Sequence, residues 1–227
     1  MTKGAQAVDP NTPPEVLADI IGDVRRIFAW DEWNMCMGAA GNPNLPVRVM
    51  EDIALHGDKN LKCGLANNPR LTQTVFEVLM QDKDVHPDLV WNKNIPLHFL
   101  VYVARSTYPT PDAHRNVAGK AQTPSSVLVE LALHPDILVR CHVAQNPNTP
   151  EWLRWVLSCD EVDQVRLFLY FCNISDELRM HILRHENSMA NLKDFMEYPH
   201  TPPLVKVWWN SDYRDTMSLE EFLEATK

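Results

Sequence analysis

The segment Asn146-Pro147-Asn148-Thr149-Pro150 indicates the architecture of this chain, because versions of it recur along nearly the whole length. The closest copies are Asp9–Pro13, Asn42–Pro46 and Tyr198–Pro202. With the weaker copies included, the last residues of the eight copies, here called the anchors, are at positions 13, 46, 72, 96, 124, 150, 175 and 202. After a first interval of 33 residues, the anchors are 24 to 28 residues apart. A near-constant period in this range is typical of solenoid proteins, which stack one supersecondary unit per repeat.

The repeated segment has the residues expected where one helix ends and another begins. In four copies a threonine precedes the final proline, and we predict that its hydroxyl caps the following helix while the proline takes the first helical position. These threonines are Thr12, Thr123, Thr149 and Thr201. Thr12 and Glu15 also have the spacing of a capping box. The earlier proline of the segment disfavours helical backbone in the residue before it, so the preceding helix must end there.

Apolar residues recur three and seven positions after each anchor, as in Val127 with Leu131 and Leu153 with Leu157. Residues four apart stack on one face of a helix, so each repeat begins with an amphipathic helix. This pattern also assigns Trp209 to the core. A second segment of about two turns follows, which fits a short α-helix or a 3₁₀ piece. Small residues recur six positions before most anchors, and Val90 is the exception; they are Ala40, Ala66, Ala118 and Ala144.

These patterns predict an all-α fold, an α-solenoid of about eight repeats of 24–28 residues. Each repeat has a longer α-helix followed by a short α or 3₁₀ helix. We predict a single repeat domain over 1–227, in which 1–40 form the N-terminal cap and first repeat, 41–200 the central repeats and 201–227 the C-terminal cap. Ser218 and Glu221 predict another capping box in that last part.

Composition restricts the function. The 227 residues carry a formal charge of −9, which disfavours broad nucleic-acid binding and fits a basic partner. Five cysteines without C-x-x-C spacing, and no signal peptide at the start, predict reduced thiols in a cytoplasmic protein. No apolar stretch approaches the roughly 20 residues that span a bilayer, so no membrane association is expected.

The segment 139–150, Val-Arg-Cys-His-Val-Ala-Gln-Asn-Pro-Asn-Thr-Pro, resembles the leucine-rich repeat variant (LRV) family. Residues 123–132, Thr-Pro-Ser-Ser-Val-Leu-Val-Glu-Leu-Ala, resemble the second half of the family's repeat. The resemblance covers about residues 8–210. It implies a right-handed superhelix of alternating α- and 3₁₀-type helices, and it implies no single activity. Some members bind an iron–sulfur cluster through N-terminal cysteines, but only Cys36 lies near this N-terminus, so we expect no cofactor.

Candidate binding residues are basic and aromatic. Lys62, Arg140 and Arg166 each lie sixteen positions after an anchor, and Arg115 joins them in a shifted register. Such a row of cations fits phosphates or the carboxylates of a partner. The alternative is pairing within the fold, with acids of the inter-helix turns; the acids considered are Asp58, Asp136 and Asp163. Trp152 and Trp155, on either side of Arg154, are candidate binding anchors.

Signals for catalysis are weak. His181 and His185 are four apart, as in some zinc sites, but no third ligand is evident and no metal is expected. No nucleotide-binding or hydrolase motif is present, and no catalytic residue is assigned. The fourth repeat is irregular, with a loop over 106–111; an enzyme there would use residues such as His98, Tyr102, Asp112 and His114.

We therefore predict a non-enzymatic interaction module that binds a protein or peptide along its surface. The alternative is a nucleic-acid-binding repeat protein that uses the basic residues against phosphates. An enzyme is the third hypothesis.

Overall fold

The computed structural model describes residues 2–23, 30–107, 111–186 and 189–226. Within these ranges the regular structure is entirely helical, with seventeen α-helices, two 3₁₀ helices and no strand, which confirms the predicted all-α class. The chain divides into two compact units, Met1–Lys120 and Ala121–Lys227, and each is described by itself. No helix in the described ranges is long and apolar enough to cross a bilayer.

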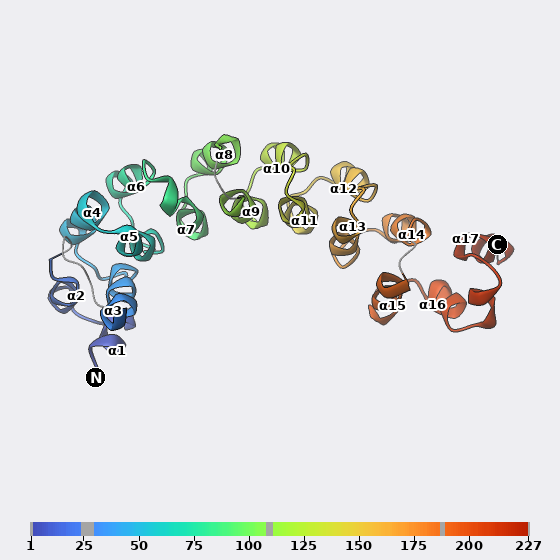
Figure 1. Cartoon of the computed structure of the whole chain (residues 1–227), viewed down its shortest axis with the longest axis horizontal. Helices are drawn as coiled ribbons and strands as arrows, with labels where there is room; N and C mark the ends of the chain where they lie inside the picture. The colour runs from blue at the N-terminus through green and yellow to red at the C-terminus, as the bar shows by residue number, and fades with distance from the viewer. Residues whose placement is uncertain (1, 24–29, 108–110, 187–188, 227) are drawn as a thin grey trace. The chain divides into compact units, whose positions relative to one another are not determined.

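The first unit alternates helices of two rows (Figure 1). In one row α1, α3, α5, α7 and α9 pack consecutively, and in the other α4 packs against α6. The elements are α1 (Lys3–Val8), α2 (Pro14–Ile21), α3 (Trp30–Ala40), α4 (Val47–His56), α5 (Lys59–Ala66), α6 (Gln73–Leu79), η1 (Lys83–Val85), α7 (His86–Trp91), α8 (Leu97–Arg105) and α9 (Asp112–Gly119).

The second unit repeats this alternation. Helix α11 packs on α13, and both α12 and α14 also contact α13. The elements are α10 (Ser125–Leu131), α11 (Ile137–Gln145), α12 (Glu151–Leu157), α13 (Asp163–Tyr170), α14 (Asp176–Arg184), α15 (Met189–Glu197), α16 (Pro203–Trp209), η2 (Asp212–Asp215) and α17 (Leu219–Ala225). In the repeats that begin with α10, α12 and α14, the helix that follows the anchor helix is thus an α-helix. The family resemblance implies 3₁₀ character for this second helix.

Every anchor is followed at once by a helix: α2, α4, α6, α8, α10, α12, α14 and α16 begin at the next residue. The apolar residues seven positions after the anchors are buried in the first seven copies. The apolar residues three positions after the anchors are also buried, except for Val16 and Val49, which are half-buried. In the last copy the prediction for Trp209 was wrong, because Trp208 enters the core and Trp209 stays partly exposed beneath the Arg214 guanidinium.

The predicted threonine caps were wrong. The final proline, not the threonine before it, is the N-cap, as at Pro13 and Pro150, and the helix begins at the next residue. The threonine hydroxyl instead donates backwards, to the sixth residue before it; Thr12 bonds the Gln6 carbonyl at 2.6 Å. Thr149 and Thr201 donate in the same way to the carbonyls of Val143 and Phe195. The hydroxyl thereby satisfies a carbonyl near the C-terminus of the preceding helix, where helical partners are missing.

A side-chain cap occurs where the anchor is itself a hydroxyl residue. Thr72 and Ser175 each accept a backbone N–H three residues on, at 3.3 Å. The capping box predicted from Ser218 and Glu221 is confirmed, with bonds of 3.2 and 2.8 Å. Thr12 forms no such box, since Pro13 is the N-cap of α2 and no side chain caps that helix.

The first asparagine of the repeated segment joins neighbouring repeats. The side-chain amide of Asn68 is fully buried and donates to the carbonyls of Ala40 and Asn42, at 2.9 and 2.7 Å. Its Oδ1 accepts the Arg70 N–H at 2.9 Å. Asn42 donates to Ala7 and Asp9 (3.0 and 2.8 Å) and Asn92 to Ala66 and Asn68 (2.7 and 2.8 Å). We call Asn42, Asn68 and Asn92 the asparagine spine. Each donates hydrogen bonds to carbonyls at the C-terminal end of the preceding repeat.

At two of the other positions four residues before an anchor, a different donor makes part of the same contact. Lys120 reaches the Asn92 carbonyl with its Nζ at 2.8 Å, and burial lowers the pKa of this ammonium. Tyr198 donates its hydroxyl to the Phe171 carbonyl at 2.9 Å. Lysine and tyrosine thus replace asparagine as the donor to the repeat before, whereas Phe171, at the same position before Ser175, has no side-chain donor.

Candidate functional site

The basic residues of the predicted row make ion pairs with acids of the following repeat. Lys62 Nζ lies 3.1 Å from Asp82 Oδ2. Arg166 donates to the Asp160 carbonyl at 2.7 Å, and its other terminal nitrogen lies 3.7 Å from Glu186 Oε2. These contacts favour the alternative of pairing within the fold.

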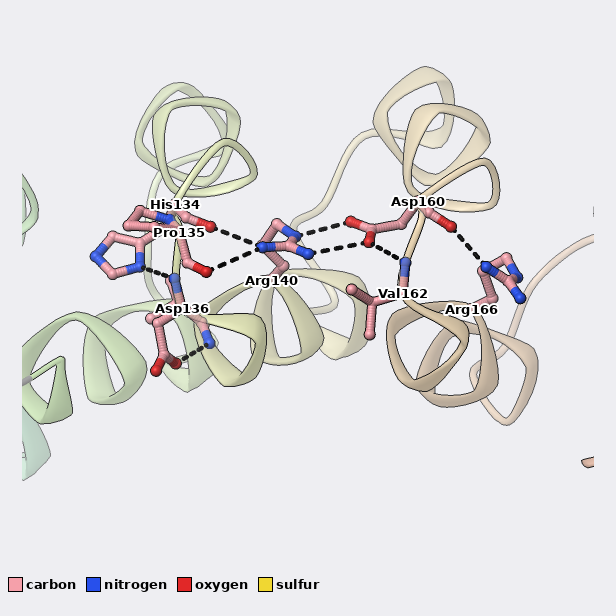
Figure 2. A network of polar contacts seen from close by, with 8 residues as sticks. His134, Pro135, Asp136, Arg140, Asp160, Val162 and Arg166 are labelled. Atoms are coloured by element: carbon pink, nitrogen blue, oxygen red, sulfur yellow. Dashed lines mark hydrogen bonds and ion pairs between the residues drawn. The ribbon is translucent and has the colours of Figure 1, made fainter.

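Arg140 shows this pairing most completely (Figure 2). Its Nε and Nη2 donate to the two oxygens of Asp160 at 2.8 and 3.0 Å, and Nη1 donates to the His134 carbonyl at 3.0 Å. The two charged side chains are 12% and 9% exposed. Burial by itself raises the pKa of Asp160, but hydrogen bonds from Arg140 and from the Val162 N–H outweigh this effect and lower the pKa.

Arg140→Gln should lower the free energy of unfolding by about 3 kcal/mol at neutral pH, because it leaves a largely buried carboxylate without its fork of donors. Since the folded-state pKa of Asp160 lies below its ordinary 3.8, the pair stabilises the fold above that pH, and the contribution is lost as the pH falls further. Urea denaturation at pH 7 and below pH 4 measures both effects, with exposed Lys193→Gln as the control. An equal loss in both variants at pH 7 would show that the pair contributes no net stability.

The acids named as pairing candidates have other roles. Asp58 and Asp136 are N-caps, accepting from the N–H groups of Leu61 and Val139 at 2.9 and 3.1 Å. Asp163 is the first residue of α13. Arg115 is half-buried and pairs with Asp112 of its own helix at 3.1 Å. Binding roles for Lys62, Arg115, Arg140 and Arg166 stay predictions, and the described contacts give all four a place in the fold.

The two candidate tryptophans lie in different environments on α12. Trp155 is half-buried, and its ring centroid lies 5.2 Å from that of His181 on α14, so Trp155 contributes to packing between two repeats. Trp152 is 57% exposed. Val156, one turn further along α12, is 56% exposed and lies on the same side of the helix. We call Trp152 and Val156 together the Trp152 face.

Exposed acids occur on α12 itself and at the start of α14. Glu151 precedes Trp152 in the chain, and Asp176 and Glu177 open the neighbouring repeat's helix α14; all three are exposed. Residues 121–227 include sixteen acidic and nine basic residues, a formal charge of −7.

Several of these nine cations bond inward. Arg154 donates to the carbonyls of Asn146 and Asn173, at 3.3 and 2.9 Å, and Arg179 is 2% exposed. Arg140 and Arg166 pair as described above. The accessible charge of this unit is therefore predominantly negative.

The four residues proposed for an enzyme make their described contacts elsewhere. Asp112 pairs with Arg115, and a ring nitrogen of His114 lies 2.9 Å from the Ser106 carbonyl. The Tyr102 ring contacts His86, and His98 is exposed. Residues 108–110 of the irregular loop lie outside the described ranges. No contact described here brings these four side chains together.

His181 and His185 are neighbours on α14, with ring centroids 4.6 Å apart. Among the described residues no group of three histidine, cysteine or acidic side chains is placed to hold a metal ion. Neither Val156 nor the exposed acids of α12 and α14 were among the residues predicted from the sequence. An available signal was that both Trp152 and Val156 fall outside the buried positions of the repeat.

No family model matches the sequence, and no match is found among the curated proteins or the solved structures.

Proposed function

We propose that this chain is a non-enzymatic helical-repeat scaffold, a right-handed solenoid of eight LRV-like repeats, that binds a protein or peptide at the Trp152 face. The repeated joints of each unit support the first part. The asparagine spine joins repeats in the first unit, and the Arg140–Asp160 pair joins two in the second. Solenoids of this kind expose an extended surface suited to recognition.

The observation that carries the binding proposal is the exposure of Trp152. Tryptophan is enriched among interface residues that contribute most of the binding free energy. A side chain of this size that is 57% exposed, with Val156 beside it, is an apolar surface without a partner in its own unit. The negative charge of this unit selects the partner: we propose a segment with lysine or arginine beside apolar residues. The free thiols fit a reducing compartment, and we propose the cytoplasm.

Trp152→Ala should weaken binding of such a segment by about 30-fold, which corresponds to roughly 2 kcal/mol for a central tryptophan. A random peptide library selected against the wild-type chain supplies the ligands, and isothermal titration of the selected peptides measures the effect. Thermal stability should change little, because Trp152 is mostly exposed.

Trp91→Ala is the matched control, since Trp91 is also 57% exposed but lies on α7 of the first unit. Selected peptides should be basic and apolar, and their affinity for the wild type should fall with salt. If they bind the Trp152→Ala and wild-type chains equally, the proposed face is not the binding site.

A further inference from the structure

The turn after α12 carries an exposed thiol beside an imidazole. Cys159 is exposed, and its Sγ lies 3.5 Å from Nε2 of His181 on α14. The two residues come from neighbouring repeats and are 22 positions apart in the chain. A thiol within hydrogen-bond reach of a base is the arrangement that activates cysteine as a nucleophile.

The other four cysteines lie in environments that suppress this chemistry. Burial raises the pKa of Cys63 to about 12, with nearby Asp88 adding to the effect. It also raises the pKa of Cys141, to about 11, and that of Cys172. Cys36 is buried, with its thiol 3.7 Å from the Ile20 carbonyl. Since the thiolate is the reactive form, these four should react slowly in the folded chain.

Cys159 lies in a surface groove that a small oxidant can enter. This groove is lined by Ser158, Cys159, Asp160, Arg166 and His185. Two charged groups of this groove are already paired, Asp160 with Arg140 and Arg166 with Glu186. The ring of His185 packs against that of His181.

His181 is suited to accept a proton. Burial, followed by the nearby His185 and Arg184, lowers the pKa of His181, so the ring is neutral at physiological pH. The imidazole is positioned by ring contacts with Trp155 and His185, whose centroids lie 5.2 and 4.6 Å from its own. A neutral, positioned imidazole next to an accessible thiol can act as a general base.

We propose that the Cys159–His181 pair is a thiol-modification site that reacts selectively with peroxides. His181 Nε2 takes the thiol proton, and the thiolate attacks one oxygen of hydrogen peroxide. The S–O bond forms as the O–O bond breaks, sulfur is oxidised by two electrons, and the departing hydroxide takes the proton from His181 and leaves as water. The product is the sulfenic acid of Cys159, which a small thiol converts to a mixed disulfide with loss of water. This site does not depend on the proposed binding function.

The test treats the full chain with hydrogen peroxide, traps sulfenic acid with dimedone, and follows each cysteine by peptide mass spectrometry. Cys159 should react at least ten times faster than the other four, and at least ten times faster than it does in urea. His181→Gln should remove most of this advantage, whereas His200→Gln, at an exposed histidine, should leave it unchanged. Circular dichroism confirms that both variants are folded.

The rate of Cys159 alkylation by iodoacetamide, measured across pH 5–9, tests whether His181 acts as the base. In the wild type the Cys159 rate should exceed that of the His181→Gln chain most strongly where His181 is neutral and the ordinary thiol is protonated. A Cys159 rate equal to its rate in urea, or a rate unaffected by His181→Gln, would overturn the proposal.

Discussion

Arg179→Met should lower the free energy of unfolding by about 4 kcal/mol. The Arg179 guanidinium is 2% exposed and donates to the carbonyls of Tyr170, Cys172 and Ile174. These carbonyls end α13 and begin the connection to α14, where helical partners are missing. Removing the donors leaves buried carbonyls unsatisfied, at a cost of about 1–3 kcal/mol each.

The rings of Tyr170 and Tyr198 add to this effect, because their centroids lie 5.2 and 5.3 Å from the Arg179 guanidinium carbon. A cation–π contact that is shielded from water contributes about 2 kcal/mol. Arg179→Lys keeps the charge but loses the planar fork of donors, so we expect an intermediate loss of about 2 kcal/mol.

Urea denaturation followed by circular dichroism measures these losses. Arg184→Met is the matched control, because Arg184 lies on the same helix and is exposed; it should change stability by less than about 0.5 kcal/mol. A loss below 1 kcal/mol for Arg179→Met would mean that water or a shifted backbone satisfies these carbonyls.

Asn68→Ala should cost about 3 kcal/mol, because it removes two buried hydrogen bonds and one part-buried hydrogen bond at once. Two carbonyls of the preceding repeat lose their donor, and the Arg70 N–H loses its acceptor. The neighbouring Asn67→Ala is the control: Asn67 is exposed and makes one bond, to the Cys63 carbonyl, so its loss should be below about 0.5 kcal/mol.

Asn68→Asp distinguishes the loss of hydrogen bonds from the loss of volume. The carboxylate has nearly the same shape as the amide but cannot donate, and it would face the Ala40 and Asn42 carbonyls. We expect a loss larger than that of Asn68→Ala at pH 7 and partial recovery as the pH falls, because the protonated acid regains one donor. Equal stability of the Asn68→Asp and wild-type chains at pH 7 would contradict the role given to the amide.

Much of the fold could be predicted because its determinants are local. The repeated segment and the spacing of apolar residues were enough to place the start of all eight anchor helices to within one residue. The hydroxyl of Thr149 was assigned to the wrong partner for the same reason. The capping rule was applied only to the helix that follows Thr149. The Thr149 hydroxyl instead reaches the Val143 carbonyl, in the helix before it.

The candidate site was less predictable. Arg140 was identified as a recurring cation, but its partner Asp160 is twenty residues away and belongs to the next repeat. Trp152 and Trp155 could not be distinguished from spacing alone, because either can face outward until the position of α14 is known. The Cys159–His181 pair likewise depends on that packing.

Helix positions, the buried columns and the all-α class follow from residue order, since prolines and apolar periodicity act within one or two turns of the chain. The partners of Asn68, Arg140 and Cys159 lie about 20 to 28 residues away, so only the packing of one repeat on another brings them together. Because of that packing, the Asn68 side chain hydrogen-bonds the repeat before it. The same packing leaves Trp152 exposed.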